Sequence, residues 1–261
     1  MKLGLFDSHA HYDDEAFAED KETLLLEMKE KGVSQIMNVA ASMESCQTTL
    51  RLAETHENIY GALGVHPSET ADLTEQDMNW IRENSKHRKI KAIGEIGLDY
   101  YWPEPDREIQ KQWFIRQLNL AREVEKPVII HSRDAAQDTF SIMKEARAEE
   151  IGGVVHCYSY SVEMAREYLN MDFYFGIGGV LTFKNAQKLK DVAAYVPIDK
   201  IVLETDSPYL APVPNRGSRN NSENLIYVAQ TLAQIKGIPY DEIVEITNRN
   251  ANRLYRIEEN I

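Results

Sequence analysis

Short apolar runs alternate with longer amphipathic stretches along the whole chain of 261 residues. The runs are nearly continuous in Ile, Val, Leu and Ala, a composition typical of parallel strands that are buried on both faces. They predict eight strands, at Lys2–Asp7, Gln35–Ala40, Tyr60–Val65, Ile90–Ile96, Pro127–His131, Gly153–Cys157, Phe173–Ile177 and Lys200–Leu203.

The stretches between these runs carry a helical repeat. In Arg107–Glu125 apolar residues recur at every third or fourth position, and the stretch ends just before Pro127, as helices usually do. Similar patterns predict helices at Glu19–Lys31 and Ser222–Lys236, each followed by a glycine suited to a helix C-terminus, and at Tyr240–Tyr255.

Eight strand–helix units in a chain of this length favour a closed (β/α)8 TIM barrel, an α/β fold. An open doubly wound sheet normally has fewer strands, and often a glycine-rich phosphate turn after the first of them. This chain reads His9-Ala10-His11 there instead. No linker or low-complexity segment divides the sequence, so residues 1–261 are expected to form a single domain.

Metal-binding side chains recur at the predicted strand ends, where barrels of this class carry their functional residues. A lone histidine after an apolar run is more often a packed core residue, but five strand ends each supplying such a side chain are hard to ascribe to chance. Residues two apart on a strand point the same way, so the first two histidines can share an ion. The candidate ligands are His9, His11, Glu95, His131, His156 and Asp206.

The number and type of these ligands predict two divalent ions. Six exceed the three protein ligands that one catalytic zinc usually takes, whereas two ions about 3.5–4 Å apart, bridged by a carboxylate, would use them all. Glu95, near the middle of the strand order, is the bridging candidate. Mixed imidazole and carboxylate ligation suits zinc, manganese, iron, cobalt or nickel better than a calcium cage, and magnesium also stays a candidate.

Composition narrows the protein class. The formal net charge of −13 argues against a broad grip on duplex DNA, so any nucleic-acid contact must be local. Two cysteines, Cys46 and Cys157, suit a reducing compartment, and the N-terminus lacks a signal-peptide pattern. No apolar run approaches the roughly 18 residues of a membrane span. We expect a cytoplasmic protein with no membrane contact and no obligate protein partner.

Six segments of fixed order and spacing identify a family. They are Phe6-Asp7-Ser8-His9-Ala10-His11, Gly64-Val65-His66-Pro67, Gly94-Glu95-Ile96-Gly97-Leu98-Asp99-Tyr100, His131-Ser132-Arg133-Asp134-Ala135, His156-Cys157-Tyr158-Ser159 and Glu204-Thr205-Asp206-Ser207-Pro208-Tyr209-Leu210. In these segments the chain resembles the TatD-type metal-dependent deoxyribonucleases, within the amidohydrolase-like barrels.

The resemblance implies an assignment of the ligands. One ion would be held by His9, His11, Glu95 and Asp206, and the other by Glu95, His131 and His156. The sequence departs from the family after the last predicted strand. Where the family often has Arg-Asn-Glu-Pro, this chain reads Arg219-Asn220-Asn221-Ser222. The arginine and asparagine are kept but the following acid is not, a difference that bears on the substrate contacts of this loop and not on the metal site.

Metal-assisted hydrolysis of phosphodiesters is therefore the expected activity, with DNA as the substrate that the resemblance implies. The ions would lower the pKa of a water molecule, and Asp206 would orient this water and take its proton. His66 and Arg133 could bind phosphate, although a turn residue before Pro67 and an ion-pair partner are equally good interpretations. Glu204 could orient a ligand histidine or serve as a structural ion-pair partner.

The net negative charge of the protein favours single strands or chain ends as substrates. This in turn favours a 3′–5′ exonuclease. Trp102 and Tyr100–Tyr101 could stack on a base, although loop aromatics more often pack locally. Two alternatives stay open: hydrolysis of another ester, amide or small phosphoester by the same ions, and a non-catalytic metal-binding barrel. The complete ligand set speaks against the second.

Overall fold

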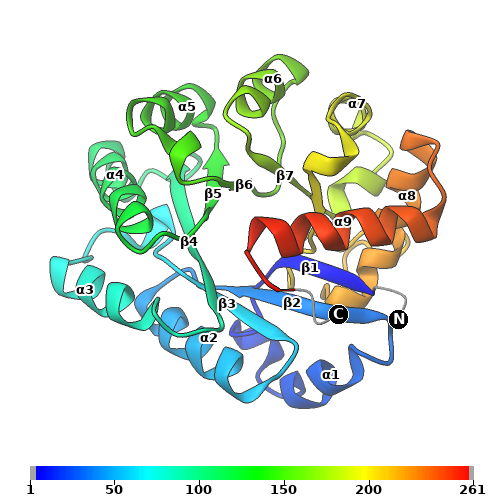
Figure 1. The fold of residues 1–261 in the computed structure, drawn as a ribbon, viewed down its shortest axis with the longest axis horizontal. Helices are drawn as coiled ribbons and strands as arrows, with labels where there is room; N and C mark the ends of the chain where they lie inside the picture. The colour runs from blue at the N-terminus through cyan, green and yellow to red at the C-terminus, as the bar shows by residue number, and fades with distance from the viewer. Residues whose placement is uncertain (1–3, 259–261) are drawn as a thin grey trace.

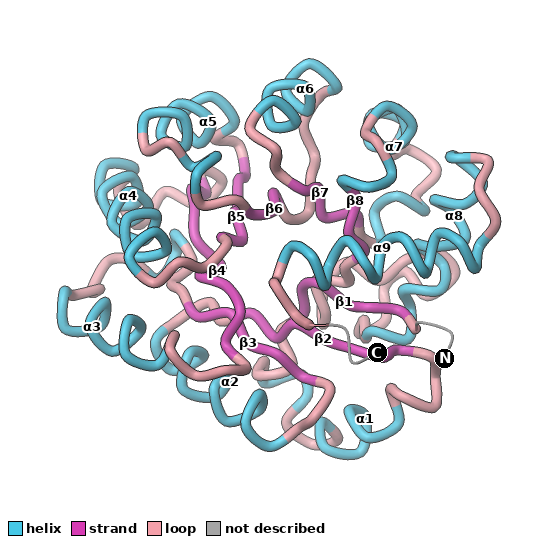
Figure 2. Tube along the Cα trace, viewed as in Figure 1, coloured by secondary structure: helices cyan, strands magenta, loops and turns pink. Residues whose placement is uncertain are grey.

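Eight parallel strands form a single sheet in the computed structural model, which describes residues 4–258. The strands neighbour one another in sequence order and curl into a ring (Figures 1 and 2). Their bounds are β1 Leu5–Ala10, β2 Val33–Val39, β3 Ile59–Leu63, β4 Ile90–Asp99, β5 Val128–Arg133, β6 Gly153–Val155, β7 Tyr174–Ile177 and β8 Ile201–Leu203. The predicted TIM barrel is confirmed.

Helices surround this ring and alternate with the strands (Figure 1). The α-helices are α1 Lys21–Glu27, α2 Met43–Thr55, α3 Glu75–Asn84, α4 Arg107–Glu123, α5 Ala136–Glu145, α6 Val162–Asn170, α7 Gln187–Tyr195, α8 Leu225–Lys236 and α9 Tyr240–Leu254. Short 3-10 helices are η1 Glu15–Phe17, η2 Pro67–Glu69, η3 Ala148–Glu150, η4 Gly179–Thr182, η5 Ile198–Lys200 and η6 Ser222–Asn224. None of the helices within residues 4–258 has both the length and the apolar character of a bilayer span.

Several predicted element ends are wrong. Helix α1 ends at Glu27 rather than at Lys31, so Gly32 lies beyond a run of turns, whereas Gly237 does cap α8 in the left-handed conformation at φ 65°. Strand β1 continues past Asp7 to Ala10, and β4 continues past Ile96 to Asp99. Lys2, the predicted start of the first strand, lies outside the described residues.

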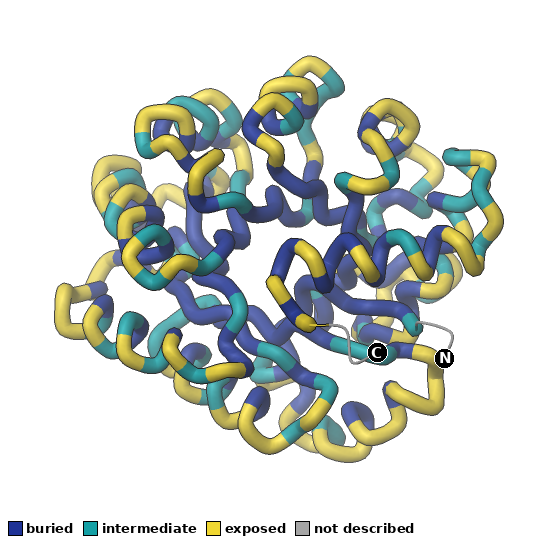
Figure 3. The backbone as a smooth tube through the Cα atoms, in the orientation of Figure 1, coloured by how far each residue is buried: buried dark blue, intermediate teal, exposed yellow. Residues whose placement is uncertain are grey.

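Two apolar cores hold the barrel together. One lies between the strands and the outer helices. The other takes side chains from all eight strands, so it must fill the barrel interior, the only space that all eight share. Most residues of the strands are buried (Figure 3). Helix α9 crosses one end of the barrel, and its residues Ala251 and Leu254, with Tyr255, join this inner core. The inner strand residues are Phe6, Met37, Val39, Ala62, Ala92, Ile129, Val154, Tyr174 and Val202.

Irregularities in two strands turn functional side chains inward. In a regular strand, side chains three positions apart face opposite sides. Phe6 and His9 nevertheless both face the interior, and the register of β1 shifts between Asp7 and Ala10. Ala92 and Glu95 do the same in β4, where the register shifts between Ile93 and Ile96.

The barrel closes where the candidate ligands lie. Strand β8 itself is short, and the chain beyond it bonds to β1: the N–H of Asp206 donates to the carbonyl of His9 at 2.9 Å, and the N–H of His11 donates to that of Ser207 at 2.8 Å. An isolated bridge pairs Ala10 with Ser207. Closure of the barrel therefore brings residues 9 and 206, far apart in sequence, side by side.

Candidate metal centre

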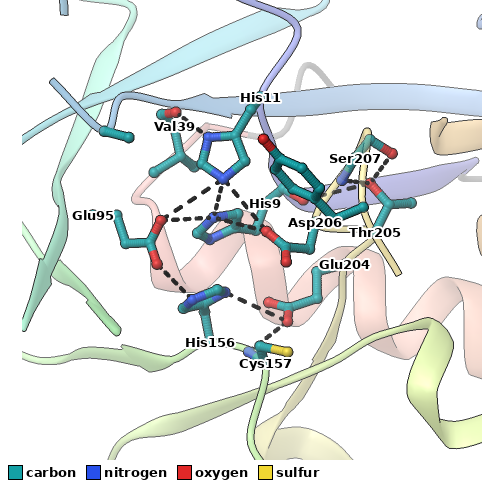
Figure 4. A network of polar contacts seen from close by, with 12 residues as sticks. His9, His11, Val39, Glu95, His156, Cys157, Glu204, Thr205, Asp206 and Ser207 are labelled. Atoms are coloured by element: carbon teal, nitrogen blue, oxygen red, sulfur yellow. Dashed lines mark hydrogen bonds and ion pairs between the residues drawn. The ribbon is translucent and has the colours of Figure 1, made fainter. Parts of the chain in front are cut away.

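Four ligand-type atoms converge at the carboxyl end of the barrel. The Nε2 atoms of His9 and His11 are 3.1 Å apart. Glu95 Oε2 lies 3.4 Å from the first and 3.7 Å from the second. Asp206 Oδ1 lies 3.8 Å and 3.4 Å from the same two nitrogens (Figure 4). All four atoms thus face a common point.

The other oxygen of Glu95 faces a second set of nitrogens. Glu95 Oε1 lies 2.7 Å from His131 Nδ1 and 2.7 Å from His156 Nε2, and these two nitrogens are 3.3 Å apart. Glu95 therefore presents one oxygen to each of two donor sets. We call His9, His11, Glu95, His131, His156 and Asp206 the central cluster.

The donor chemistry of the central cluster fits divalent cations. Ligand atoms about 2.0–2.2 Å from a tetrahedrally bound zinc ion lie roughly 3.3–3.6 Å from one another, and the separations above bracket that range. His11 Nδ1 lies 2.7 Å from the carbonyl oxygen of Val39, so it must carry a proton, and Nε2, which faces the cluster, is the nitrogen that would bind an ion. The side chains of the central cluster would hold divalent cations.

Partners outside the central cluster hold His131 directly and the backbone beside His156. His131 Nε2 lies 3.2 Å from Asp99 Oδ2. An ionised carboxylate can only accept, so Nε2 carries a proton toward Asp99, and Nδ1, which faces Glu95, is the nitrogen that would lose its proton to bind an ion. Glu204 Oε1 lies 3.8 Å from His156 Nδ1, too far for a hydrogen bond, and accepts the N–H of Cys157 at 2.5 Å. Glu204 thus fixes the backbone next to His156.

Asp99 was missed as a site residue by the sequence-based reasoning. The apolar pattern predicts a strand that ends at Ile96, and this places Asp99 in a loop. The structure puts it at the last position of β4, 3% exposed, and groups its carboxylate with His66 and His131. The signal was in the sequence: an acid two residues after a second glycine, four positions from Glu95.

His66 and Arg133, the predicted phosphate contacts, both lie beside the central cluster. The His66 ring packs edge-on against that of His131 with centroids 4.3 Å apart, and its Nδ1 bonds to Ser68. Burial, helped by the neighbouring His131, lowers the pKa of His66 to about 3, so its imidazole is neutral. Arg133 ends β5 with its guanidinium 3.7 Å from the centroid of the Tyr101 ring, and not in an ion pair with Asp134.

Burial and mutual charge shape the protonation of the metal-free cluster. Burial opposes ionisation of Glu95, but the adjacent His156 and His9 outweigh it and hold the pKa of this carboxyl well below its usual range. Burial also opposes protonation of His11, but the hydrogen bond and charge of Asp206 raise its pKa to about 10. Burial raises the pKa of Glu204 to about 8. In the metal-free protein the cluster thus pairs two ionised acids, Glu95 and Asp206, with protonated histidines, and a cation that binds there would displace the imidazole protons.

A buried hydrogen-bond network fixes the segment that carries Asp206. Asp7 accepts the hydroxyl protons of Thr205 at 2.6 Å and Ser222 at 2.5 Å, together with the N–H of Thr205 at 3.0 Å. Asn220 donates to the carbonyl of Thr205 at 2.9 Å. The loop in which the sequence departs from the family pattern therefore anchors the catalytic candidate, which itself has the left-handed φ of 57°.

A small cavity of about 180 Å³ opens beside Asp206. It runs between the ends of β6, β7 and β8 and the start of α7, and Cys157 lines it with Glu204. Cys157 belongs to none of the three groups of possible metal ligands found within residues 4–258. The remaining lining is mostly apolar, from Tyr158, Val180, Ala186, Leu189 and Leu210.

Known proteins similar to this chain include metal-dependent hydrolases. Residues 6–256 match the family model described as TatD related DNase. The chain belongs to the TatD family. It is 44% identical over 253 residues to the uncharacterized metal-dependent hydrolase YabD of Bacillus subtilis (strain 168), covering 97% of this chain and 99% of that one. It is 36% identical over 257 residues to YcfH of Escherichia coli (strain K12), also an uncharacterized metal-dependent hydrolase, covering 97% and 96%.

Solved structures of TatD proteins share the fold. The crystal structure of YjjV, a TatD homolog from Escherichia coli K12, superposes with a TM-score of 0.92 at 31% identity, covering 99% of this chain and all of that one. A TatD family hydrolase from Entamoeba histolytica has a TM-score of 0.86 at 24% identity, covering 98% of this chain and 99% of that one. This TatD protein is accordingly a metal-dependent hydrolase.

Proposed function

We propose that this TatD protein is a deoxyribonuclease with two divalent ions, and that it removes nucleotides from the 3′ ends of single-stranded DNA. One observation carries the proposal above the others. Glu95 offers each of its two carboxylate oxygens to a different set of histidines, as a residue between two ions would. The family description as a TatD related DNase supports DNA as the substrate.

Bound at the central cluster, the ions would acidify water and offset negative charge on the phosphoryl oxygens. The protein's own contribution begins with Asp206, whose side chain is 18% exposed and so reaches the mouth of the barrel. Burial opposes its ionisation, but the hydrogen bond to His11 and the charge of His156 lower the pKa of Asp206, so it is ionised near neutral pH. An ionised carboxylate at the mouth can orient a water molecule and accept its proton.

Two cluster neighbours would bind and orient the substrate. Arg133 is charged and exposed at the end of β5, where it can pair with a phosphate. His66 is neutral, with Nδ1 held by Ser68, so Nε2 remains for a hydrogen bond to a phosphate oxygen. The net charge of −13 disfavours a long duplex footprint and favours a chain end.

Elemental analysis and a nuclease assay on the same preparation test the proposal. The purified protein should carry or require divalent ions, and it should shorten a 3′-labelled single-stranded oligonucleotide from the label inward. EDTA should abolish this activity, and the metal should restore it. An intact oligonucleotide, alongside turnover of lactones or small phosphoesters by the metal-loaded protein, would show that the family fold serves another hydrolysis here.

The Asp206→Asn variant tests the role of the proton acceptor. The amide retains an oxygen that can face His11, but it cannot take a proton from water. Turnover should fall about 100-fold or more, in the range by which general bases contribute, while much of the metal stays bound. Asp14→Asn provides the matched control, because Asp14 is also an acid near this mouth and bonds to Tyr209 rather than to the cluster. Full activity of Asp206→Asn would remove the assigned role.

A further inference from the structure

Large apolar side chains are exposed together at the carboxyl end of the barrel. Ten such side chains are exposed within residues 4–258. Five of them, Leu26, Ile109, Ile115, Tyr195 and Ile226, sit on outer helices. The other five lie on the loops that follow β4 and β8, namely Tyr101, Trp102, Tyr209, Leu210 and Val213. Exposed apolar surface that concentrates around one opening is typical of a binding site.

Three residues on the β4 and β5 side of this opening form one stacked unit. The rings of Tyr101 and Trp102 meet edge to face with centroids 4.8 Å apart, and the Arg133 guanidinium covers the Tyr101 ring at 3.7 Å. Tyr101 and Trp102 each remain 53% exposed. We call these three residues the ring platform. Trp102 offers the larger open ring, because the guanidinium already occupies one face of Tyr101.

The ring platform is fixed relative to the central cluster. The N–H of Tyr101 donates to Asp99 Oδ1 at 2.9 Å, and the other oxygen of Asp99 faces His131. The N–H of Tyr100 donates to the carbonyl of Arg133 at 2.9 Å, which continues the ladder between the ends of β4 and β5. The Asp99 carboxylate therefore connects the ring platform to His131, one of the candidate metal ligands.

We propose that the ring platform stacks an unpaired base of single-stranded nucleic acid and thereby places the neighbouring phosphodiester at the central cluster. The inference rests on the proposed function, which it deepens by naming how the substrate is held. Aromatic rings bind bases through their π-faces. A duplex hides these faces in its own stack, whereas a single strand presents them.

The net charge of the protein also favours single-stranded nucleic acid as the ligand. With a net charge of −13 the protein cannot gain much affinity from a broad phosphate contact, so stacking of bases would add affinity that such a contact does not provide. Arg133 forms no ion pair within residues 4–258, and its N–H groups remain free to bind the phosphate next to a stacked base. Stacking contributes about 1–3 kcal/mol per base by alanine substitution, which is roughly a 5- to 150-fold change in affinity.

Tryptophan fluorescence of the full, metal-loaded protein measures this binding without turnover. The probe is an oligothymidylate of about eight nucleotides with nuclease-resistant phosphorothioate links. Stacking should quench Trp102, whereas Trp80 and Trp113 are only partly exposed on α3 and α4. Trp102→Phe should lose most of the quench and keep affinity measured by fluorescence anisotropy, because phenylalanine still stacks. Trp102→Ala should weaken binding about 5- to 150-fold.

Tyr195→Ala is the matched control. Tyr195 is another exposed aromatic residue with an arginine beside its ring, Arg166 at 6.0 Å, but it ends α7 away from the cluster. Binding should be unchanged in this variant. A duplex of the same length and a single strand without bases should both bind weakly and leave the fluorescence unquenched.

The outcomes separate this inference from the proposed function. If Trp102→Ala binds as tightly as the natural protein, or if the strand without bases binds equally well, the ring platform does not stack bases. Degradation of an ordinary oligonucleotide alongside either result would leave the nuclease function standing. Quenching by the probe, together with an ordinary oligonucleotide that stays intact, would instead support the platform and refute the nuclease.

Discussion

Replacing Asp99 by asparagine tests whether this acid, which does not face the ions directly, governs metal binding. Asp99 is buried and accepts two N–H groups, that of Tyr101 at 2.9 Å on one oxygen and His131 Nε2 at 3.2 Å on the other. Asparagine has only one carbonyl oxygen, so one donor must face the NH2 group. The Tyr101 N–H is closer and fixed by the backbone, so the His131 bond is the one that should be lost.

The expected loss of metal affinity follows from the His131 imidazole, whose Nε2 would be left without a hydrogen-bond acceptor. Leaving a buried donor without an acceptor costs about 1–3 kcal/mol, and the proton is no longer held at Nε2, so Nδ1 ceases to be a dependable ligand. We expect the affinity for one ion to fall roughly 5- to 150-fold, which agrees with the roughly 10- to 100-fold loss typical when the partner of a metal-binding histidine is removed. Turnover should fall in the same proportion at limiting metal and recover at saturating metal.

Zinc titration against a chelating indicator measures this loss directly. The natural protein and Asp138→Asn should behave alike, because Asp138 is a nearby carboxylate bonded to Tyr100 and Lys111, on the surface of α5. Circular dichroism of the metal-free variants checks that the fold is intact. If Asp99→Asn binds two ions with unchanged affinity, the hydrogen bond does not orient His131, and the argument fails.

Two further predictions concern protons and the backbone. In the metal-free protein His11 and His131 have raised pKa values of about 10 and about 9, because although burial opposes their protonation the acids Asp206 and Asp99 outweigh it. Metal binding at pH 7 should therefore release about two protons, and the affinity for metal should rise as the pH rises toward 9. Calorimetry in buffers of different ionisation enthalpy measures this proton release. The same observed heat in all buffers would contradict the prediction. Gly97→Ala should destabilise the metal-free protein by roughly 2–6 kcal/mol, because φ is 149° and the new Cβ would lie 1.9 Å from the carbonyl oxygen of His131. Gly152→Ala, with φ 75° and open space around it, should cost only about 1–2 kcal/mol in the same urea unfolding experiment, and an equal or larger cost there would refute the clash.

The barrel and the order of its functional residues could both be predicted from the amino-acid sequence. Continuous apolar runs and the helical repeat depend only on local side-chain direction and burial, so eight strand–helix units could be read directly. Parallel strands carry functional groups at their carboxyl ends, so histidines and acids placed there were expected to gather. The structure brings the six side chains predicted as ligands to the carboxyl end of the barrel, and it adds His66 and Asp99 beside His131.

Which side chains face inward, and what holds them there, depends on contacts that form only in the folded chain. His9 and Glu95 point into the barrel because irregularities shift the register of β1 and β4, against the alternation that a regular strand would give. Such shifts depend on hydrogen bonds to neighbouring strands, which no local pattern encodes. The contact of Asp99 with His131 and the pairing of His9 with Asp206 arise in the same way, from strand length and barrel closure, because both join residues that are distant in sequence.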